Sequence, residues 1–552
     1  MIALLPSSRV TLAFAFESYV ARRRANRCRL YKTPQRNETN NNAGIKNMRA
    51  NPVWAFSDPP PGRYHRRMPP RETTSLASNF DLVIGGERRA SADGSTFAVF
   101  EPATGEHLTT VAQAGPRDLD AALNCAVAEF ESGTWRKTNA TARGKVLLAV
   151  AALLRDRAEE FAIAEVRNSG HPIGNARWEA NAAADVFEFF AGAANKHYGQ
   201  VIPVQDAGLN VALREPVGVC GLIVPWNFPL LITCWKVAPA LACGNPVVIK
   251  PASLTPVTAL LLAEVLLEAG IPPGCVSVIP GPGATVGNKL ASDPRVAKLS
   301  FTGDSSTGAS ILRASSDNIT RLSLELGGKS ACIIFEDADI DKAIAATPMS
   351  VFDNTGQDCC ARSRFLVQRS VYDQFVEGFT AGTQSLVVGD PLSEDTQLGP
   401  MISEGQRRTS LEYLAIGNAE GANQLCGGEA SGPGWFLSPA VLSNVKNSDR
   451  VAQEEIFGPV AAIIPFDTEE DAIRMSNDSP YGLSGSLWTR DLGRAIRVTK
   501  AVRTGVIGVN TSRSVRTEAP FGGFKRSGFG RELGMAAMDH YTEVKNVFFS
   551  EE

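Results

Sequence analysis

Beyond residue 215 the chain alternates short runs of consecutive apolar residues with longer segments in which apolar residues recur every three or four positions. The runs VGVCGLIVP, NPVVIKPA, CVSVIPG and VAKLSFTG predict buried strands. TALLLAEVLLEAG predicts a helix that ends at Gly270, and we expect another helix over residues 304–315. Continuous apolar strands separated by helices are typical of a parallel sheet covered on both faces. This part of the chain is therefore predicted to form an α/β domain.

The same alternation returns after residue 330, in SACIIFED, SRFLVQRSVYDQFVEGFTAG and PVAAIIPFDTEEDAIRMSND, and predicts a second α/β domain in tandem. Residues 81–108 have the pattern of short strands joined by glycine-rich turns, and amphipathic helices are expected over 118–132 and 141–170. LNVALREP at 209–216 and TEVKNVFFS at 542–550 predict isolated strands outside either alternation.

The first 78 residues lack this periodicity, and we expect them to be disordered, a targeting segment or an extended N-terminus. They carry a net charge of +10 and include Arg22-Arg23-Arg24. Three interpretations are a mitochondrial transit peptide, a secretory signal and an extension upstream of the true start. Arg9 and Glu17 interrupt the apolar run, which disfavours a secretory signal. We expect a cytoplasmic protein with an extended start, and the mitochondrial matrix is the alternative.

Two classes of partner, nucleic acid and membranes, are excluded by the sequence. The chain has 552 residues and a net charge of −3, so residues 79–552 hold −13, which is no footprint for nucleic acid. Residues 217–235 are 19 consecutive uncharged positions, but Pro225, Asn227 and Pro229 interrupt them. A strand, a turn and a helix start fit this stretch better than a membrane span, so no membrane partner is expected.

The ten cysteines include no CxxC pair and the five histidines are scattered, so no metal site is predicted. Most of the cysteines lie in apolar runs and are expected to be small buried hydrophobes. Cys359 differs because its segment, FDNTGQDCCARSR, is polar and is bracketed by Arg362 and Arg364. Nearby cations would lower the pKa of a thiol and make it a nucleophile.

Other residues suit a catalytic or ligand-binding role, but each also has a simpler structural interpretation. Glu325, at a strand end before two glycines, suits a general base or an ion pair with Lys329. Asn227 is an amide in an apolar segment and could be a fixed hydrogen-bond donor. The glycine-containing segments 281–287 and 300–308 could bind a phosphate or be an ordinary turn and helix cap.

In combination these segments resemble the aldehyde dehydrogenase superfamily over about residues 80–550. The matching pieces, in order, are PWNFP, VIKPASLTP, SFTGDSSTG, LELGGK, NTGQDCCARSR, EEIFGPV, NDSPYGLSGSLWT and PFGGFKRSGFGRELG.

The resemblance implies a role for each matching residue. Cys359 is the expected nucleophile, Glu325 the general base, and Asn227 with the Cys359 backbone N–H the oxyanion hole, whereas Cys360 is expected to do no chemistry. The residues expected to bind NAD or NADP are Lys250, Ser253, Gly303, Asp304, Gly308, Glu455, Phe457 and Trp226. Those expected along the substrate tunnel are Phe228, Trp235, Asp353, Asp358 and Phe521.

The implied architecture is α/β, with a Rossmann-like cofactor-binding domain at 79–197 and 218–328 and a catalytic domain at 329–526. A β-flap at 198–217 and 541–552 is expected to join subunits into a homodimer or homotetramer. The implied reaction is oxidation of an aldehyde to a carboxylic acid. A dehydrogenase that passes the acyl group to coenzyme A, and a catalytically silent structural or binding protein of the same fold, are the alternatives.

Three departures from the family pattern bear on specificity. Ser253 stands where many NAD-preferring relatives have glutamate, and Asp304 stands where a serine is common. Asp353 and Asp358 replace an aromatic and a small residue of the tunnel, which would favour a cationic or hydroxylated aldehyde.

Overall fold

The computed structural model describes residues 76–551. All of the described residues belong to one of the chain's two units, Pro70–Glu552, which is called the second unit below. Our expectations for the N-terminal segment, up to residue 75, lie outside the described residues.

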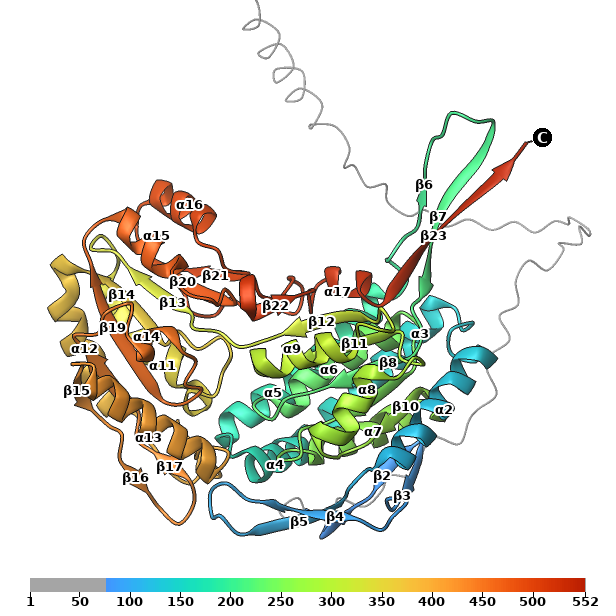
Figure 1. Cartoon of the computed structure of the whole chain (residues 1–552), viewed down its shortest axis with the longest axis horizontal. Coiled ribbons are helices and arrows are strands. Elements are labelled where there is room, and N and C mark those ends of the chain that lie inside the picture. Colours follow the sequence, from blue (N-terminus) through green and yellow to red (C-terminus); the bar gives the residue numbers. More distant parts are fainter. Residues whose placement is uncertain (1–75, 552) are drawn as a thin grey trace, which may run out of the picture. The chain divides into compact units, whose positions relative to one another are not determined.

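An eight-stranded sheet, in the order β22-β12-β11-β8-β9-β10-β2-β3, is built mainly from the first part of the second unit (Figure 1). Its five strands from β12 to β10 run parallel, and the outer strands are antiparallel. The strands are β2 Leu82–Ile84, β3 Glu87–Arg89, β8 Cys220–Ile223, β9 Val247–Lys250, β10 Val276–Val278, β11 Lys298–Thr302, β12 Arg321–Glu325 and β22 Gly528–Phe529. This is the predicted Rossmann-like arrangement.

Helices cover both faces of this sheet, which explains why its strands are continuously apolar. Val247 and Ile249 pack in the core cluster that includes residues of α3 to α7, whereas Val248 packs in the cluster that includes residues of α2, α8 and α9. Successive residues of a strand point to opposite faces, so each face needs its own apolar set. The helices are α2 Pro116–Ser132, α3 Ala140–Asp156, α4 Ala158–Ser169, α5 Ile173–Ala193, α6 Pro229–Ala242, α7 Val257–Glu268, α8 Asn288–Ser292 and α9 Ser305–Ala314.

A second sheet of seven strands, in the order β15-β18-β19-β14-β13-β20-β21, is parallel except for β15. The strands are β13 Ala331–Ile334, β14 Arg364–Gln368, β15 Asn423–Cys426, β18 Ala440–Ser443, β19 Val460–Phe466, β20 Ser484–Trp488 and β21 Val506–Val509. Its helices are α10 Ile340–Ala346, α11 Pro348–Phe352, α12 Tyr372–Gln384, α13 Glu404–Ala419, α14 Arg450–Gln453, α15 Glu469–Asn477 and α16 Leu492–Ala501. The α/β fold class is thus confirmed.

The two strands expected to be isolated pair with each other. β7 Gly208–Pro216 runs antiparallel to β23 Thr542–Ser550 along its whole length, and β6 Gln200–Val201 adds a third strand. This β-flap leaves large apolar side chains exposed, among them Leu209, Val544 and Phe549. The remaining elements are β1 Asn79–Phe80, β4 Thr96–Phe100, β5 His107–Ala112, β16 Ala430–Ser431, β17 Phe436–Leu437 and α17 Ala536–Asp539.

Two local features depart from the sequence pattern. The helical segment expected over 141–170 is broken at Arg157 into α3 and α4, and residues 283–287 form a π-helical turn. Among the described residues, no helix has the length and apolar character that a membrane crossing requires.

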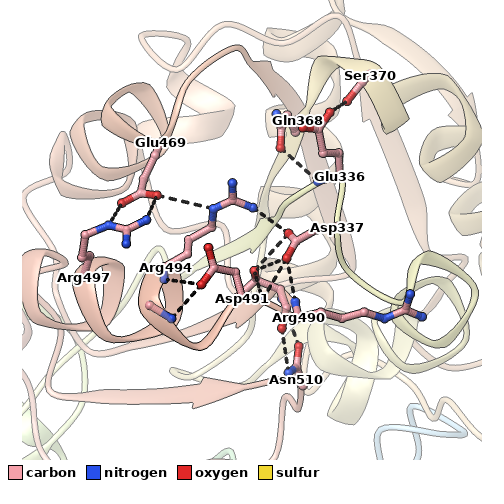
Figure 2. A network of polar contacts seen from close by, with 12 residues as sticks. Glu336, Asp337, Gln368, Ser370, Glu469, Arg490, Asp491, Arg494, Arg497 and Asn510 are labelled. Carbon is pink, nitrogen blue, oxygen red and sulfur yellow. Dashed lines mark hydrogen bonds and ion pairs between the residues drawn. The ribbon is translucent and has the colours of Figure 1, made fainter.

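Asp337 follows β13 at the carboxyl edge of the second sheet, where the strand order reverses between β13 and β20 (Figure 2). Asp337 Oδ2 accepts hydrogen bonds from the backbone N–H groups of Arg490 and Asp491, each at 2.9 Å, just before α16. Arg494 donates to Asp337 Oδ1 at 2.7 Å and also pairs with Glu469, which binds Arg497. The network therefore fixes α16 and α15 to the end of β13.

We predict that Asp337→Asn lowers the free energy of unfolding by about 1–3 kcal/mol, because a charged acceptor for several donors becomes a neutral amide. Urea unfolding followed by circular dichroism measures the change. Asp341→Asn, an exposed change in the first turn of α10, is the control and should shift stability by less than about 0.5 kcal/mol. Equal effects of the two variants would contradict the prediction.

Candidate active site

The order of the first sheet reverses between β8 and β11, so the carboxyl ends of these two strands form its crevice. In open α/β sheets, ligands bind at such a switch point. The segment 224–228, with Trp226 and Asn227, follows β8, and Gly303 and Asp304 follow β11. The sequence motifs at 225–229 and 300–308 therefore meet at one edge.

The loop before Cys359 is fastened to Asn227. The Asn227 side-chain amide donates to the Gln357 carbonyl at 3.0 Å, and the Asn354 amide donates to the Asn227 carbonyl at 2.8 Å. Asn354 and Thr355 have φ of 49° and 55°, a left-handed backbone that is rare for threonine. Such strain persists only where the surroundings hold it, and it clusters at functional sites.

Cys359 is partly exposed, whereas Cys360 is only 4% exposed. The contact with the Cys360 thiol, together with burial and the Asp358 and Glu455 carboxylates, raises the pKa of Cys359 well above its usual value. The two arginines make other contacts: Arg362 donates to the Cys360 carbonyl and Ser514, and Arg364 to the Lys329 and Met475 carbonyls. The pKa of Cys359 is therefore raised and not lowered, contrary to the expectation from its neighbouring arginines.

Glu325 ends β12 and is 3% exposed, and neither of its carboxylate oxygens has a hydrogen-bond partner. Burial, and then the Glu532 carboxylate, raise the pKa of Glu325 well above its usual value. An ion pair with Lys329, the simpler interpretation, is not found in the described part of the chain. A buried carboxyl with unpartnered oxygens and a raised pKa has an increased affinity for a proton, which suits a general base.

Lys250, at the end of β9, is 5% exposed and donates to the Pro251 carbonyl at 3.0 Å. Burial lowers its pKa to about 8. No carboxylate among residues 76–551 is paired with it, so its ammonium is available to hydroxyl or phosphate oxygens of a ligand. Ser253 lies nearby in sequence and bonds weakly, at 3.4 Å, to the Gly281 carbonyl.

Asp304 caps α9 by accepting hydrogen bonds from the backbone N–H groups of Ser306 and Thr307, both at 2.9 Å. Burial would raise the Asp304 pKa, but these bonds and those from the two hydroxyls lower it overall. A side chain at Gly303 would meet the Phe301 ring at 2.5 Å, and one at Gly308 would meet Leu326 at 2.7 Å. The backbone around the start of α9 is therefore closely packed, and the simple helix cap is present.

Glu455 accepts a hydrogen bond from the Gly328 N–H at 2.8 Å, and burial raises its pKa to about 7. The Cβ of any residue replacing Gly327 would come within 1.8 Å of the Glu455 carboxylate, which explains the glycine. Phe457, in a left-handed conformation with φ of 56°, packs edge-on against Trp226 at 5.2 Å between ring centroids. The structure thus brings the segment around 455–457 to the end of β8.

The residues predicted for the substrate tunnel fall into two groups. Trp235 and Phe521 pack together at 5.1 Å between ring centroids, and Phe228 packs on His171 at 5.3 Å. Asp353 accepts hydrogen bonds from Asn175 and from the Asn354 N–H, and Asp358 from the Cys360 N–H at 2.8 Å. Both aspartates therefore support the loop backbone, and burial raises the pKa of each.

The sequence analysis did not predict two clusters of buried ionisable side chains. Lys236, fully buried in α6, forms an ion pair with Glu532, and the Ser300 hydroxyl donates to the same carboxylate at 3.0 Å. His171 lies with Glu165 and Glu179 under Asn227. A signal existed for the first: a lysine inside the otherwise uncharged helix PLLITCWKVAPALA requires a partner.

Comparison with known proteins identifies the relatives of this chain. Residues 89–547 match the family model described as "Aldehyde dehydrogenase family". Human retinal dehydrogenase 2 is 42% identical over 484 residues, which is 87% of this chain and 93% of that protein. "Aldehyde dehydrogenase family 2 member B4, mitochondrial" from Arabidopsis thaliana is 42% identical over 85% of this chain and 88% of that protein.

Solved structures agree. The betaine aldehyde dehydrogenase of Staphylococcus aureus in complex with NAD+ superposes with a TM-score of 0.83 and 36% identity, and the match covers 85% of this chain and 94% of that one.

We predict that iodoacetamide labels Cys359 before Cys360, because only Cys359 is partly exposed, and that labelling accelerates with rising pH as the thiolate forms. Asp358→Asn removes a carboxylate that raises the thiol pKa, so labelling at a fixed pH should become faster. Peptide mass spectrometry against time measures both, with Cys360→Ala as the control that keeps the labelled peptide. Modification of Cys360 first would refute the assignment.

Proposed function

The chain belongs to the aldehyde dehydrogenase family, and from this membership we propose how its site carries out aldehyde oxidation to a carboxylic acid with NAD+ or NADP+. The observation that carries the proposal is that Asn227 is hydrogen-bonded to the loop of Cys359, while Glu325 lies buried nearby with both carboxylate oxygens unpartnered. A nucleophile, a donor for an oxyanion and a base are the groups that acyl chemistry of this kind needs.

In the proposed reaction the Cys359 sulfur adds to the aldehyde carbon, and the carbonyl oxygen becomes an oxyanion. The Asn227 amide and the Cys359 backbone N–H donate hydrogen bonds to that oxygen. When bound, NAD(P)+ would supply the hydride acceptor, and the loss of hydride from the former aldehyde carbon would convert the Cys359 adduct into a thioester. Glu325 then takes a proton from the water that hydrolyses the Cys359 thioester, and the carboxylic acid leaves while the thiol is restored.

The residues at the crevice fit such a cofactor. Lys250 has an ammonium without a carboxylate partner, Glu455 presents a buried carboxylate that can accept from a ribose hydroxyl, and the α9 N-terminus lies beside Gly303. We propose that residues 79–197 and 218–328 form the cofactor-binding domain and residues 329–526 the catalytic domain.

The unpartnered carboxylate oxygens of Glu325 favour hydrolysis of the thioester over transfer of the acyl group to coenzyme A. Hydrolysis needs a base that activates water, whereas transfer to coenzyme A uses no water. The presence of Cys359, Asn227 and Glu325 together argues against a silent structural protein. The exposed apolar residues of the β-flap support our proposal that the chain forms a homodimer or homotetramer. For the compartment we propose the cytoplasm, with the mitochondrial matrix as the alternative.

The proposed function is tested by absorbance of NAD(P)H over a panel of aldehydes, with and without coenzyme A. We expect reduction of the cofactor without coenzyme A, and no turnover in Cys359→Ala. Activity that required coenzyme A, or turnover that survived Cys359→Ala, would rule the proposal out.

We predict that Glu325→Gln still gives one equivalent of NAD(P)H in a rapid burst, followed by turnover at least about tenfold slower, because the thioester persists without its base. Stopped-flow absorbance separates the two phases. Asp341→Asn, an exposed substitution on α10, serves as the control and should keep both. Loss of the burst together with turnover would mean that Glu325 acts before hydride transfer.

We predict relaxed cofactor choice, with kcat/KM for NADP+ within about tenfold of that for NAD+, because Ser253 carries no charge that would repel a 2′-phosphate. Ser253→Glu should lower kcat/KM for NADP+ selectively, and Ser253→Gln is the uncharged control of the same length. Steady-state kinetics with each cofactor decide, and a preference for NAD+ above about a thousandfold in the unmodified enzyme would overturn the argument.

A further inference from the structure

Three ionisable side chains are buried under the end of β8, outside the proposed catalytic set. Glu165 lies on α4, Glu179 on α5, and His171 in the turn between these helices, and their exposures are 0%, 0% and 2%. Glu165 accepts a hydrogen bond from the Leu230 N–H at 3.1 Å and Glu179 from the Leu231 N–H at 3.0 Å. Both carboxylates therefore bind the first turn of α6, which begins at Pro229, two residues after Asn227.

The two ring nitrogens of His171 both face acceptors. Nδ1 lies 3.0 Å from Glu179 Oε2, and Nε2 lies 2.7 Å from the carbonyl oxygen of Asn227. A neutral imidazole has only one N–H, so it could serve only one of these oxygens and would turn a lone pair toward the other. An imidazolium donates to the Asn227 carbonyl and places its positive charge beside Glu179 Oε2, a buried carboxylate oxygen that has no hydrogen-bond partner, and this is the form that the geometry favours.

The charges around the ring explain how such a cation is maintained in the interior. The carboxyl groups that act on it are Glu165, Glu179 and Asp353, and the Cys234 thiol lies near the two glutamates. Burial alone would lower the His171 pKa, but the contact with Glu179, the charges of the two glutamates and the Asn227 carbonyl raise it to about 9. Burial and the neighbouring Glu179 raise the pKa of Glu165 to about 8.

We propose that His171, as an imidazolium, is a positioning residue that fixes the Asn227 peptide and thereby aims the Asn227 amide at the oxyanion formed on Cys359. The inference rests on the oxyanion role proposed for Asn227. His171 does not touch the reacting atoms. It holds the Asn227 carbonyl together with Asn354, which donates to the same oxygen at 2.8 Å, and its ring also supports Phe228.

Two substitutions separate charge from shape. His171→Gln keeps a donor but is neutral, and His171→Lys keeps a positive charge. We expect the burst rate to fall about ten- to hundredfold in His171→Gln, because a small displacement of Asn227 costs rate. NAD+ affinity, followed by quenching of tryptophan fluorescence, should stay unchanged, and His171→Lys should remain within about threefold of the parent rate. Equal losses in both variants would overturn the proposal.

The pH profile is a second readout, which does not depend on how well the neutral variant folds. The His171 proton is held below about pH 9 and lost above it. Activity of the parent enzyme should therefore fall as the pH rises through that value, whereas His171→Lys should keep its activity to higher pH. An alkaline limb that is identical in both enzymes contradicts the proposal.

A double-mutant cycle with Asn227→Ala distinguishes failure of this inference from failure of the proposed function. If Asn227→Ala slows the burst about a hundredfold, His171→Gln should add little to it. A full additional loss in the double variant means that His171 acts independently of Asn227. A normal burst in Asn227→Ala alone would instead refute the oxyanion role.

Discussion

The site depends on one constraint: Asn227 is 3% exposed, so its buried carbonyl and side-chain amide need hydrogen-bond partners from the protein. Its carbonyl accepts from His171 and Asn354, and its side-chain amide donates to Gln357. These bonds join the α4–α5 turn, the end of β8 and the loop before Cys359, which come from three distant parts of the sequence. The strained Asn354 and Thr355 are tolerated because this junction over-determines their backbone.

Buried charge is balanced in two neighbouring clusters. Lys236 is paired with Glu532 next to Glu325, and His171 with Glu179 next to Glu165. In a medium of low polarity a carboxyl that lies beside another carboxylate has a raised pKa, and this is the case for Glu165 and for Glu325. Glu165 uses one of its oxygens to accept from the Leu230 N–H, so it supports the backbone. Neither oxygen of Glu325 has a partner, so the same physics yields a group with a raised affinity for a proton.

The sequence was sufficient for the parallel sheets, because runs such as NPVVIKPA are apolar on both faces and need helices on both. The motifs also located Cys359, Glu325 and Asn227, whose roles remain to be tested by experiment. Two things could not be predicted. The raised pKa of Cys359 comes from burial and from its contacts with Cys360, Asp358 and Glu455, which the neighbouring arginines in the sequence did not reveal. The His171 cluster depends on three residues that are ordinary polar positions in sequence and meet only when α4, α5 and β8 pack together.

The two sheets share a reversal of strand order, at β8 and β11 and again at β13 and β20. After β11 the chain continues through Gly303, which has no side chain, and Asp304 accepts from the backbone N–H groups of Ser306 and Thr307 in its own helix. After β20 the corresponding positions are Thr489 and Arg490, and the Asp337 carboxylate from the end of β13 accepts from the backbone N–H groups of Arg490 and Asp491, which could otherwise hold an anion (Figure 2). In both sheets an aspartate therefore binds backbone N–H groups beside the reversal, but only at the second does that aspartate come from another strand and fasten the helix to the sheet.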